Sequence, residues 1–172
     1  MGVNQRALVR MTDDEVRSFL ERGRTATIAT IGPGGFPHLV AMWYGLVGGR
    51  ICFETKAKSQ KAVNLRRDPR VSCSVEAGES YDQLRGVVIE GTAAIIEDTS
   101  ADEYWAAAVS VFERYERAYT EEMRPLVQQM MNKRAMIRID PVRVRSWDHR
   151  KLGLAPMPVA GSTARYLTAQ SL

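Results

Sequence analysis

The residues best suited to binding chemistry are concentrated in one stretch, residues 53–71, with the sequence FETKAKSQKAVNLRRDPRV. The pattern predicts a strand that ends near Thr55, a short helix over residues 59–67 with Ser59 as its N-cap, and a strand from residue 71. The basic side chains near the two ends of this helix are Lys56, Lys58, Lys61, Arg66 and Arg67. Because a helix N-terminus presents unpaired N–H groups and a positive dipole end, lysines beside it favour binding of phosphate or another anion. The alternative is that this charge run is a solvated basic face.

The composition places this candidate site in an ordinary soluble chain. Of 172 residues, 45% are hydrophobic and 26% are charged, which indicates one globular domain over residues 1–172. The net charge of +4 suits acidic ligands but is too small to indicate nucleic acid, and no aromatic residues alternate with the basic ones of this stretch. No apolar run approaches the roughly 18 residues of a membrane helix, and residues 1–15 lack the apolar segment of a secretory signal. We therefore expect a cytoplasmic protein with neither nucleic acid nor a membrane as its partner.

The chain has only two cysteines, Cys52 and Cys73, and each lies in an apolar, strand-like run. No Cys-x-x-Cys pair and no Cys/His metal spacing is present. We therefore expect buried free thiols in a reducing compartment and no metal site.

Two capping boxes mark the predicted helical regions. Thr12, followed by Glu15, opens a first helix that ends at Gly23. Ser100, followed by Glu103, opens a longer helical region that reaches about residue 133 and breaks near residues 119–120. The buried stripe of the longer region is predicted to be Tyr104, Ala108, Val111, Phe112 and Tyr115.

Alternating and β-branched stretches predict the strands. They cover residues 25–31, 37–46, 50–55, 71–76, 85–96, 135–139 and 142–147. Gly48-Gly49 forms a tight hairpin, and Pro141 acts as a hinge between the last two strands. Short strands separated by turn signals predict a mainly β fold, a small and mostly antiparallel barrel with flanking helices.

No catalytic constellation is evident, so no catalytic residue is predicted. His38 and His149 are the only histidines, and no nucleophile elbow, Walker loop or dinucleotide fingerprint occurs. An anion pocket on a β-barrel without acid–base groups is typical of a cofactor binder in which the cofactor supplies the chemistry.

Several segments together resemble the flavin-binding split β-barrel of the pyridoxamine 5′-phosphate oxidase superfamily over about residues 12–148. These are the first helix, ATIATIGPGGFPHLVAMWYG, FETKAKSQKAVNLRRDPRV, GVVIEGTA and RVRSWDHRKL. In the oxidases a threonine that ends the third strand and a Ser-Arg-Lys that opens the next helix hold the ribityl phosphate. Thr55, Ser59 and Lys61 match these positions, but Gln60 replaces the arginine. His38 and Trp43 stand where the oxidases place an arginine and a lysine on the preceding strand, so two cationic phosphate contacts are missing.

The resemblance is closer to the actinobacterial branch that uses the deazaflavin coenzyme F420. It rests on Pro37-x-x-x-x-Met42-Trp43, on the lysine-rich loop from Thr55 and on Ser-Trp-Asp near the C-terminus. That coenzyme carries a phosphodiester and a polyglutamate tail, which suits lysines spread along a loop. The cofactor-binding residues so implied are His38, Leu39, Val40, Ala41, Met42, Trp43, Thr55, Lys56, Lys58, Ser59, Lys61, Trp147 and Lys151. Backbone groups of residues 39–42 would bond the pyrimidine edge of the ring, and Trp43 would shape the substrate side. The alternative for Trp43 and Trp147 is ordinary packing in the core of the barrel.

The resemblance also implies a Greek-key-like barrel that forms a homodimer, with the cofactor in a groove between two copies. Residues 149–172 would form a C-terminal strap that reaches the partner's site, with contributions from Trp147, Arg150 and Lys151. The expected function is an F420H2-dependent reductase that transfers hydride to an unsaturated small molecule of the tetrapyrrole, quinone or enone type. The alternatives are an FMN-dependent oxidoreductase on the same fold and a non-catalytic protein that binds a cofactor or haem.

Overall fold

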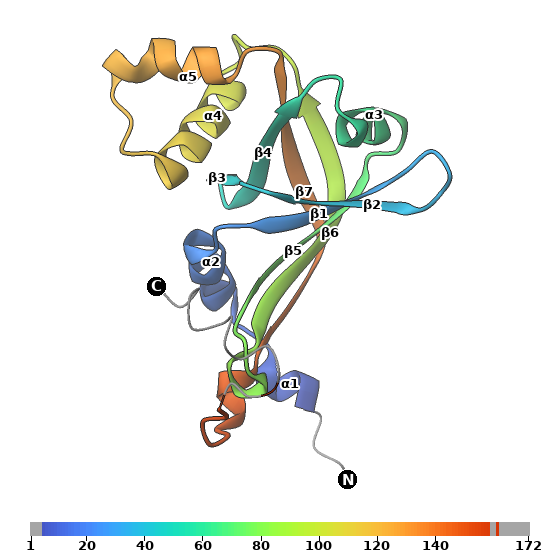
Figure 1. Ribbon diagram of the computed structural model, residues 1–172, viewed down its shortest axis with the longest axis vertical. Coiled ribbons are helices and arrows are strands. Elements are labelled where there is room, and N and C mark those ends of the chain that lie inside the picture. Colours follow the sequence, from blue (N-terminus) through green and yellow to red (C-terminus); the bar gives the residue numbers. More distant parts are fainter. Residues whose placement is uncertain (1–4, 159–160, 162–172) are drawn as a thin grey trace. The chain divides into compact units, whose positions relative to one another are not determined.

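The computed structural model describes residues 5–158 and residue 161 (Figure 1). The chain forms two compact units. One consists of the described parts of residues 1–23, 75–88 and 145–172, and the other consists of residues 24–74 and 89–144. Three long strands contribute residues to both units, namely β5 (Arg70–Ala77), β6 (Arg85–Ile96) and β7 (Arg134–Asp148).

Seven strands hydrogen-bond in the order β2-β1-β5-β6-β7-β4-β3. The other four strands are β1 (Ala26–Ile31), β2 (Pro37–Met42), β3 (Gly45–Val47) and β4 (Arg50–Lys56). The pairings of β1 with β2 and β5, and of β4 with β3 and β7, are antiparallel. The prediction of a mainly antiparallel β fold with flanking helices is confirmed, and the sheet is consistent with a split barrel.

The helices are α1 (Gln5–Val9), α2 (Asp13–Arg22), α3 (Gln60–Arg67), α4 (Asp102–Tyr115) and α5 (Arg124–Met130), with the 3-10 helices η1 (Tyr81–Gln83), η2 (Glu121–Met123) and η3 (His149–Leu152). Within residues 24–74 and 89–144, α3 packs against β1, and α4 packs against β3 and β4 (Figure 1). In the other unit, α1 and η1 both contact η3. Among the described residues no helix has the length and apolarity to cross a membrane.

Local sequence signals fix several of these boundaries. The Thr12 hydroxyl accepts a hydrogen bond from the Glu15 N–H at 3.3 Å, and the Glu15 carboxylate accepts one from the Thr12 N–H at 2.7 Å. This reciprocal capping box starts α2 as predicted. Gly48 and Gly49 have φ of 56° and 76°, which only glycine adopts without strain, and they form the predicted tight turn into β4.

The prediction of one strand over residues 37–46 is wrong. β2 ends at Met42 and pairs with β1, whereas β3 begins at Gly45 and pairs with β4. Trp43 and Tyr44 lie between the two strands, and the Tyr44 N–H donates to the hydroxyl of Tyr115 at 3.0 Å. The hydroxyl of Tyr115, a residue of α4, thus gives the Tyr44 N–H the hydrogen bond that a neighbouring strand would otherwise supply. The apolar sequence pattern continues through these two residues, so the pattern does not indicate that the strand is interrupted there.

The predicted break at Pro141 is also wrong, because β7 runs without interruption from Arg134 to Asp148. The pairing of β7 with β4 extends only to Arg138, so Pro141 lies beyond it and its missing N–H breaks no bond to β4. Gly91 explains the close approach of β6 here, since a Cβ on it would lie 2.3 Å from the Asp140 carbonyl oxygen.

The predicted capping box at Ser100 and Glu103 does not form. The N-cap of α4 is Ala101, and the Ser100 N–H and hydroxyl both bond Asp98 instead, at 2.9 and 2.6 Å. Glu103 pairs with Arg138. Each member of the motif therefore has a stronger partner elsewhere. The predicted stripe is buried except for Tyr115, which is partly exposed.

The core of the larger unit holds Cys52 among Tyr104, Phe112 and Met136. Cys73 is buried on β5, and both cysteines are free thiols as predicted. Burial raises the pKa of each thiol to about 12, so both remain protonated at neutral pH.

Candidate functional site

The predicted anion-binding side chains meet where β4 ends and α3 begins. The hydroxyls of Thr55 and Ser59 are hydrogen-bonded at 2.9 Å, and the Lys61 ammonium donates to Thr55 Oγ1 at 3.1 Å. Thr55 is buried and lies in register with Ala135 of β7, so the sheet holds its hydroxyl in place. Ser59 is the N-cap of α3, and its hydroxyl accepts from the Ala62 N–H at 3.4 Å. The structure therefore brings these three residues of the motif together.

This cluster offers the groups that an oxyanion requires. The N–H groups of Gln60 and Lys61 lie in the first turn of α3, where helical geometry supplies no carbonyl partner. Burial lowers the pKa of Lys61, and the nearby Glu54 carboxylate opposes this shift. A bound anion would favour the charged ammonium and offset the cost of its partial burial. The cluster is thus cationic, partly desolvated and aligned with the positive end of a helix dipole.

The basic residues at the two ends of α3 differ in their contacts. At its C-terminal end Arg66 pairs with Glu97 and donates to the Ala57 carbonyl oxygen, and Arg67 donates to the Ile31 carbonyl oxygen. Lys56 and Lys58 are exposed and have no ion pair within residues 5–158. The arginines therefore stabilise the fold, whereas the two lysines present charge that no described residue neutralises.

A cavity of about 1130 Å³ adjoins these lysines and was not predicted from the sequence. Its cationic lining consists of Lys56, Lys58, Lys133 and Arg134. Lys133 has φ of 60°, an unusual conformation for a lysine, and its carbonyl oxygen accepts from the Ala57 N–H at 3.0 Å. A strained residue in a pocket wall is typical of a functional site. The adjacent basic pair Lys133-Arg134, where β7 begins, is the signal that could have identified it.

The residues implied for the cofactor ring lie along β2, an edge strand. One backbone edge of residues 37–42 pairs with β1, and no described strand covers the other edge. Leu39 is exposed beside it. Unpaired N–H and C=O groups on such an edge can bond a planar ligand, as the sequence analysis expected of residues 39–42.

His38 on β2 has a buried polar atom that needs a partner. Its Nδ1 is buried and makes no hydrogen bond to any described residue. Thr30 lies directly opposite in register, and its hydroxyl accepts from the buried Asn64 amide of α3 at 3.0 Å. Directly opposed residues share a face of the sheet, so His38 lies on the face of the sheet that Asn64 of α3 contacts. A ligand that hydrogen-bonds Nδ1 would remove the cost of leaving it unpaired.

Trp43 is held by an aromatic support that the sequence analysis missed. Its ring stacks on Tyr115 with centroids 4.4 Å apart and planes within 5°. The Tyr115 hydroxyl donates to the Arg24 carbonyl oxygen at 2.7 Å, and the Arg24 guanidinium lies 4.7 Å from the same ring. Trp43 remains 55% exposed, so one side of a fixed indole is presented to solvent. Ordinary core packing therefore does not describe Trp43.

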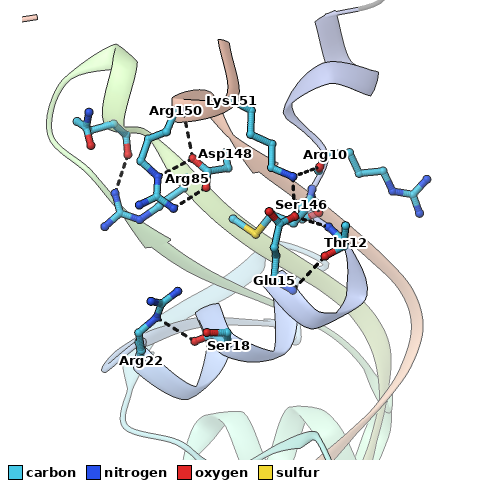
Figure 2. A network of polar contacts seen from close by, with 12 residues as sticks. Arg10, Thr12, Glu15, Ser18, Arg22, Arg85, Ser146, Asp148, Arg150 and Lys151 are labelled. Carbon is cyan, nitrogen blue, oxygen red and sulfur yellow. Dashed lines mark hydrogen bonds and ion pairs between the residues drawn. The ribbon is translucent and has the colours of Figure 1, made fainter. Parts of the chain in front are cut away.

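The C-terminal candidates lie in the other unit, where Arg150 and Lys151 have polar partners within that unit (Figure 2). Lys151 donates to the Glu15 carboxylate and to the Arg10 carbonyl oxygen, and Arg150 forms a two-bond pair with Asp148. Trp147 is partly buried over Gly86. Their contribution to a partner's site stays a prediction. Residues 159–160 and 162–172 of the proposed strap fall outside the described residues.

An antiparallel sheet with a cationic cluster at a helix N-terminus is suited to binding a phosphate group. The chain belongs to the pyridoxamine 5′-phosphate oxidase family, whose model matches residues 12–148. The superfamily named from the sequence is thereby confirmed.

Three solved structures show what the chain is similar to. The conserved hypothetical protein Rv2991 from Mycobacterium tuberculosis is 57% identical, with a TM-score of 0.88 over 92% of this chain and 98% of that one. An F420 reductase is 25% identical, with a TM-score of 0.56 over 77% of this chain and 98% of that one. HutZ, the heme storage protein from Vibrio cholerae, is 17% identical with a TM-score of 0.61 over 77% and 92%, which shows the fold alone. Comparison with curated proteins gave no match.

Proposed function

We propose that this protein binds the deazaflavin coenzyme F420 and acts as an F420H2-dependent reductase of an unsaturated organic acceptor. The observation that carries this proposal is the spread of cations. Lys61 lies in the cluster with Thr55 and Ser59, and further charges line the adjoining cavity. A phosphodiester followed by several carboxylates needs positive charge distributed over distance, whereas the compact phosphate of FMN needs charges that converge. The similarity to an F420 reductase supports the same choice.

The residues present fit such a coenzyme. Thr55, Ser59 and Lys61 would hold the phosphodiester, and Lys56 and Lys58 would meet the tail. The open edge of β2 and the unpaired Nδ1 of His38 would satisfy polar atoms of the ring. When bound, the coenzyme supplies the hydride chemistry.

The chain itself orients the reactants and excludes water. Trp43 is fixed by Tyr115 and offers a flat apolar wall against which a planar acceptor can pack. Leu39, on the same stretch, offers a second apolar contact. No described side chain is assigned as a proton donor, and the acceptor is protonated by solvent or by a group still to be identified.

We also propose that the protein is a homodimer in which a second copy covers apolar surface. Phe36, Leu39 and Val142 are 83%, 61% and 78% exposed, and Val144 is exposed as well. Val142 and Val144 lie two residues apart on the part of β7 that extends beyond its pairing with β4, so both side chains point to the same face of the strand. Exposed apolar residues in that position are typical of an interface.

Anaerobic mixing of the protein with the reduced coenzyme and an enone or quinone tests the reaction. We expect oxidation of the coenzyme that requires both protein and acceptor, and that slows when Trp43 is replaced by alanine. Binding of the coenzyme without oxidation by any acceptor of these classes would favour a non-catalytic carrier. A purified protein that carries yellow FMN would favour the second candidate, an FMN-dependent oxidoreductase of the same family.

A further inference from the structure

A second group of cations lies in the unit that consists of the described parts of residues 1–23, 75–88 and 145–172. Arg22 ends α2, Arg85 begins β6 and Arg150 lies in η3. Together they line a cavity of about 200 Å³, whose remaining walls include Phe19 and Glu76. Figure 2 shows Arg85 and Arg150 near Asp148, with Arg22 on α2. Three side chains far apart in the sequence thus bring guanidinium groups to one small space.

The geometry of Arg150 is imposed by a buried carboxylate. Asp148, whose side chain is 9% exposed, accepts from Arg150 Nε at 2.8 Å and Nη2 at 2.6 Å. The Arg150 backbone N–H donates to the same carboxylate at 3.1 Å. This pairing lowers the pKa of Asp148, so the carboxylate stays ionised and keeps the guanidinium in one orientation. A fixed arginine loses little freedom when it binds a ligand.

Arg85 has donors to spare. Within the described part of the chain its side chain donates one hydrogen bond, from Nη1 to the Gln83 carbonyl oxygen at 2.9 Å, although a guanidinium has five N–H donors. Burial, together with the charges of Arg150 and Arg22, lowers the pKa of Arg85, and Asp148 opposes this only in part. Arg22 uses its Nε for the Ser18 carbonyl oxygen at 3.2 Å. Two carboxylates, Asp148 and Glu76, thus face three guanidinium groups, and positive charge remains.

We propose that this cavity is a second anion site, in which Arg22, Arg85 and Arg150 bind a small oxyanion, either a phosphate group or a carboxylate. Guanidinium groups bind both through paired N–H donors, and a bound anion would relieve the repulsion among three like charges. The cavity volume suits one such group and not a coenzyme. Its role is independent of the reductase function proposed above.

Calorimetric titration at constant ionic strength tests the proposal, with inorganic phosphate and succinate as separate probes. The titrations use the Ser59→Ala/Lys61→Gln background, so that the cluster at α3 does not contribute. We expect saturable binding of at least one probe that weakens at least tenfold in Arg85→Gln, and the tighter probe tells a phosphate from a carboxylate ligand. Arg17→Gln is the matched control, because Arg17 is an exposed arginine on α2 whose one ion pair among the described residues is with Asp14, and it does not line the cavity. The affinity of Arg17→Gln for the anion probes should equal that of the background variant.

A stability measurement separates binding from a structural role. Without added anion, the melting temperature of Arg85→Gln should be no lower than that of the Ser59→Ala/Lys61→Gln background. The reason is that the substitution removes a positive charge that Arg22 and Arg150 repel. If Arg85→Gln fails to fold, Arg85→Lys replaces it, because lysine keeps the charge but loses the paired donors. The anion affinity of Arg85→Lys should lie between that of the background and the tenfold weaker value expected for Arg85→Gln. No saturable binding of either probe, or an equal loss in Arg17→Gln, would overturn the second site.

Discussion

Lysines and arginines around α3 carry the same charge but make different contacts. Arg66 and Arg67 bond backbone carbonyl oxygens, and these contacts hold α3 to its neighbours. Lys56 and Lys58 bond no described carboxylate, and among the described residues the Lys61 ammonium donates to the Thr55 hydroxyl. The sequence showed one continuous basic run, and only the structure separates the residues that stabilise the helix from those available to a ligand.

Replacing Lys56, Lys58 and Lys61 together with alanine should weaken coenzyme binding far more than folding. Exposed charges contribute under about 1 kcal/mol each to stability. A charge-assisted bond to a phosphate contributes roughly 1.5–3 kcal/mol, so a loss of at least about a hundredfold in affinity is expected. Fluorescence titration and urea denaturation measure the two effects. Arg67→Ala is the control and should keep its affinity while losing stability; a triple variant that binds normally would show that this loop is not the anion site.

The pH dependence of binding should follow Lys61. Burial lowers the pKa of its ammonium in the folded protein, so the free site loses its proton at a lower pH than an ordinary lysine. An anion binds the charged form, and affinity should therefore be constant near neutral pH and fall as the pH rises through the lowered pKa. Lys61→Arg keeps its charge throughout this range. If the alkaline loss of affinity is the same in Lys61→Arg, another group is responsible for it.

At the scale of elements, the alternation of apolar residues along the strands and the turn-forming residues between them predicted most of the sheet. The limits of β6 agree with the prediction at both ends, and Ser59 and Thr12 cap their helices as expected. The failures occurred where a distant side chain decides the outcome. Tyr115 bonds the Tyr44 N–H and so splits a predicted strand, and Arg138 takes Glu103 from its capping box. Such tertiary partners leave no local signal.

The same limit applies to the candidate site. Thr55, Ser59 and Lys61 were predicted because they lie within seven residues of one another at a strand–helix junction. Lys133 and Arg134 were missed because they are distant in the sequence and reach the site through the pairing of β7 with β4 and the bond from the Ala57 N–H to the Lys133 carbonyl oxygen. The support of Trp43 by Tyr115 was missed for the same reason.

Substitution of Gly86 tests whether the stability of the smaller unit depends on the close approach of β6 and β7. A Cβ on Gly86 would lie 2.3 Å from Trp147 Cζ2, so Gly86→Ala forces the indole or the strand to move. We expect a destabilisation of about 1–3 kcal/mol, measured by urea denaturation with tryptophan fluorescence. Gly34→Ala is the matched control, because a Cβ there would meet its nearest atom only at 3.9 Å. Equal stability of the two variants would show that Trp147 is free to move away.

At the scale of the whole molecule, the main expectation is dimerisation. Val142 and Phe36 are too apolar and too exposed for an isolated chain, and a second copy would cover them. Light scattering coupled to size exclusion should give twice the mass of 19.3 kDa at micromolar concentration. Val142→Lys should shift the equilibrium towards the monomer and weaken coenzyme binding in parallel. A stable monomer that retains full affinity would contradict the dimer.

The identity of the coenzyme is the central claim, and it depends on all three scales. The cations of this chain are spread along a loop and a cavity, and the resemblance to the oxidases implies that His38 and Trp43 stand where two phosphate-binding cations would otherwise lie. The measurement is a titration of the protein, free of cofactor, with F420 and with FMN under the same conditions, followed by tryptophan fluorescence at two salt concentrations. We predict that F420 binds at least about tenfold more tightly, a difference of roughly 1.4 kcal/mol, and that its affinity falls as salt is added. Equal affinities, tighter FMN, or binding that does not respond to salt would contradict the account.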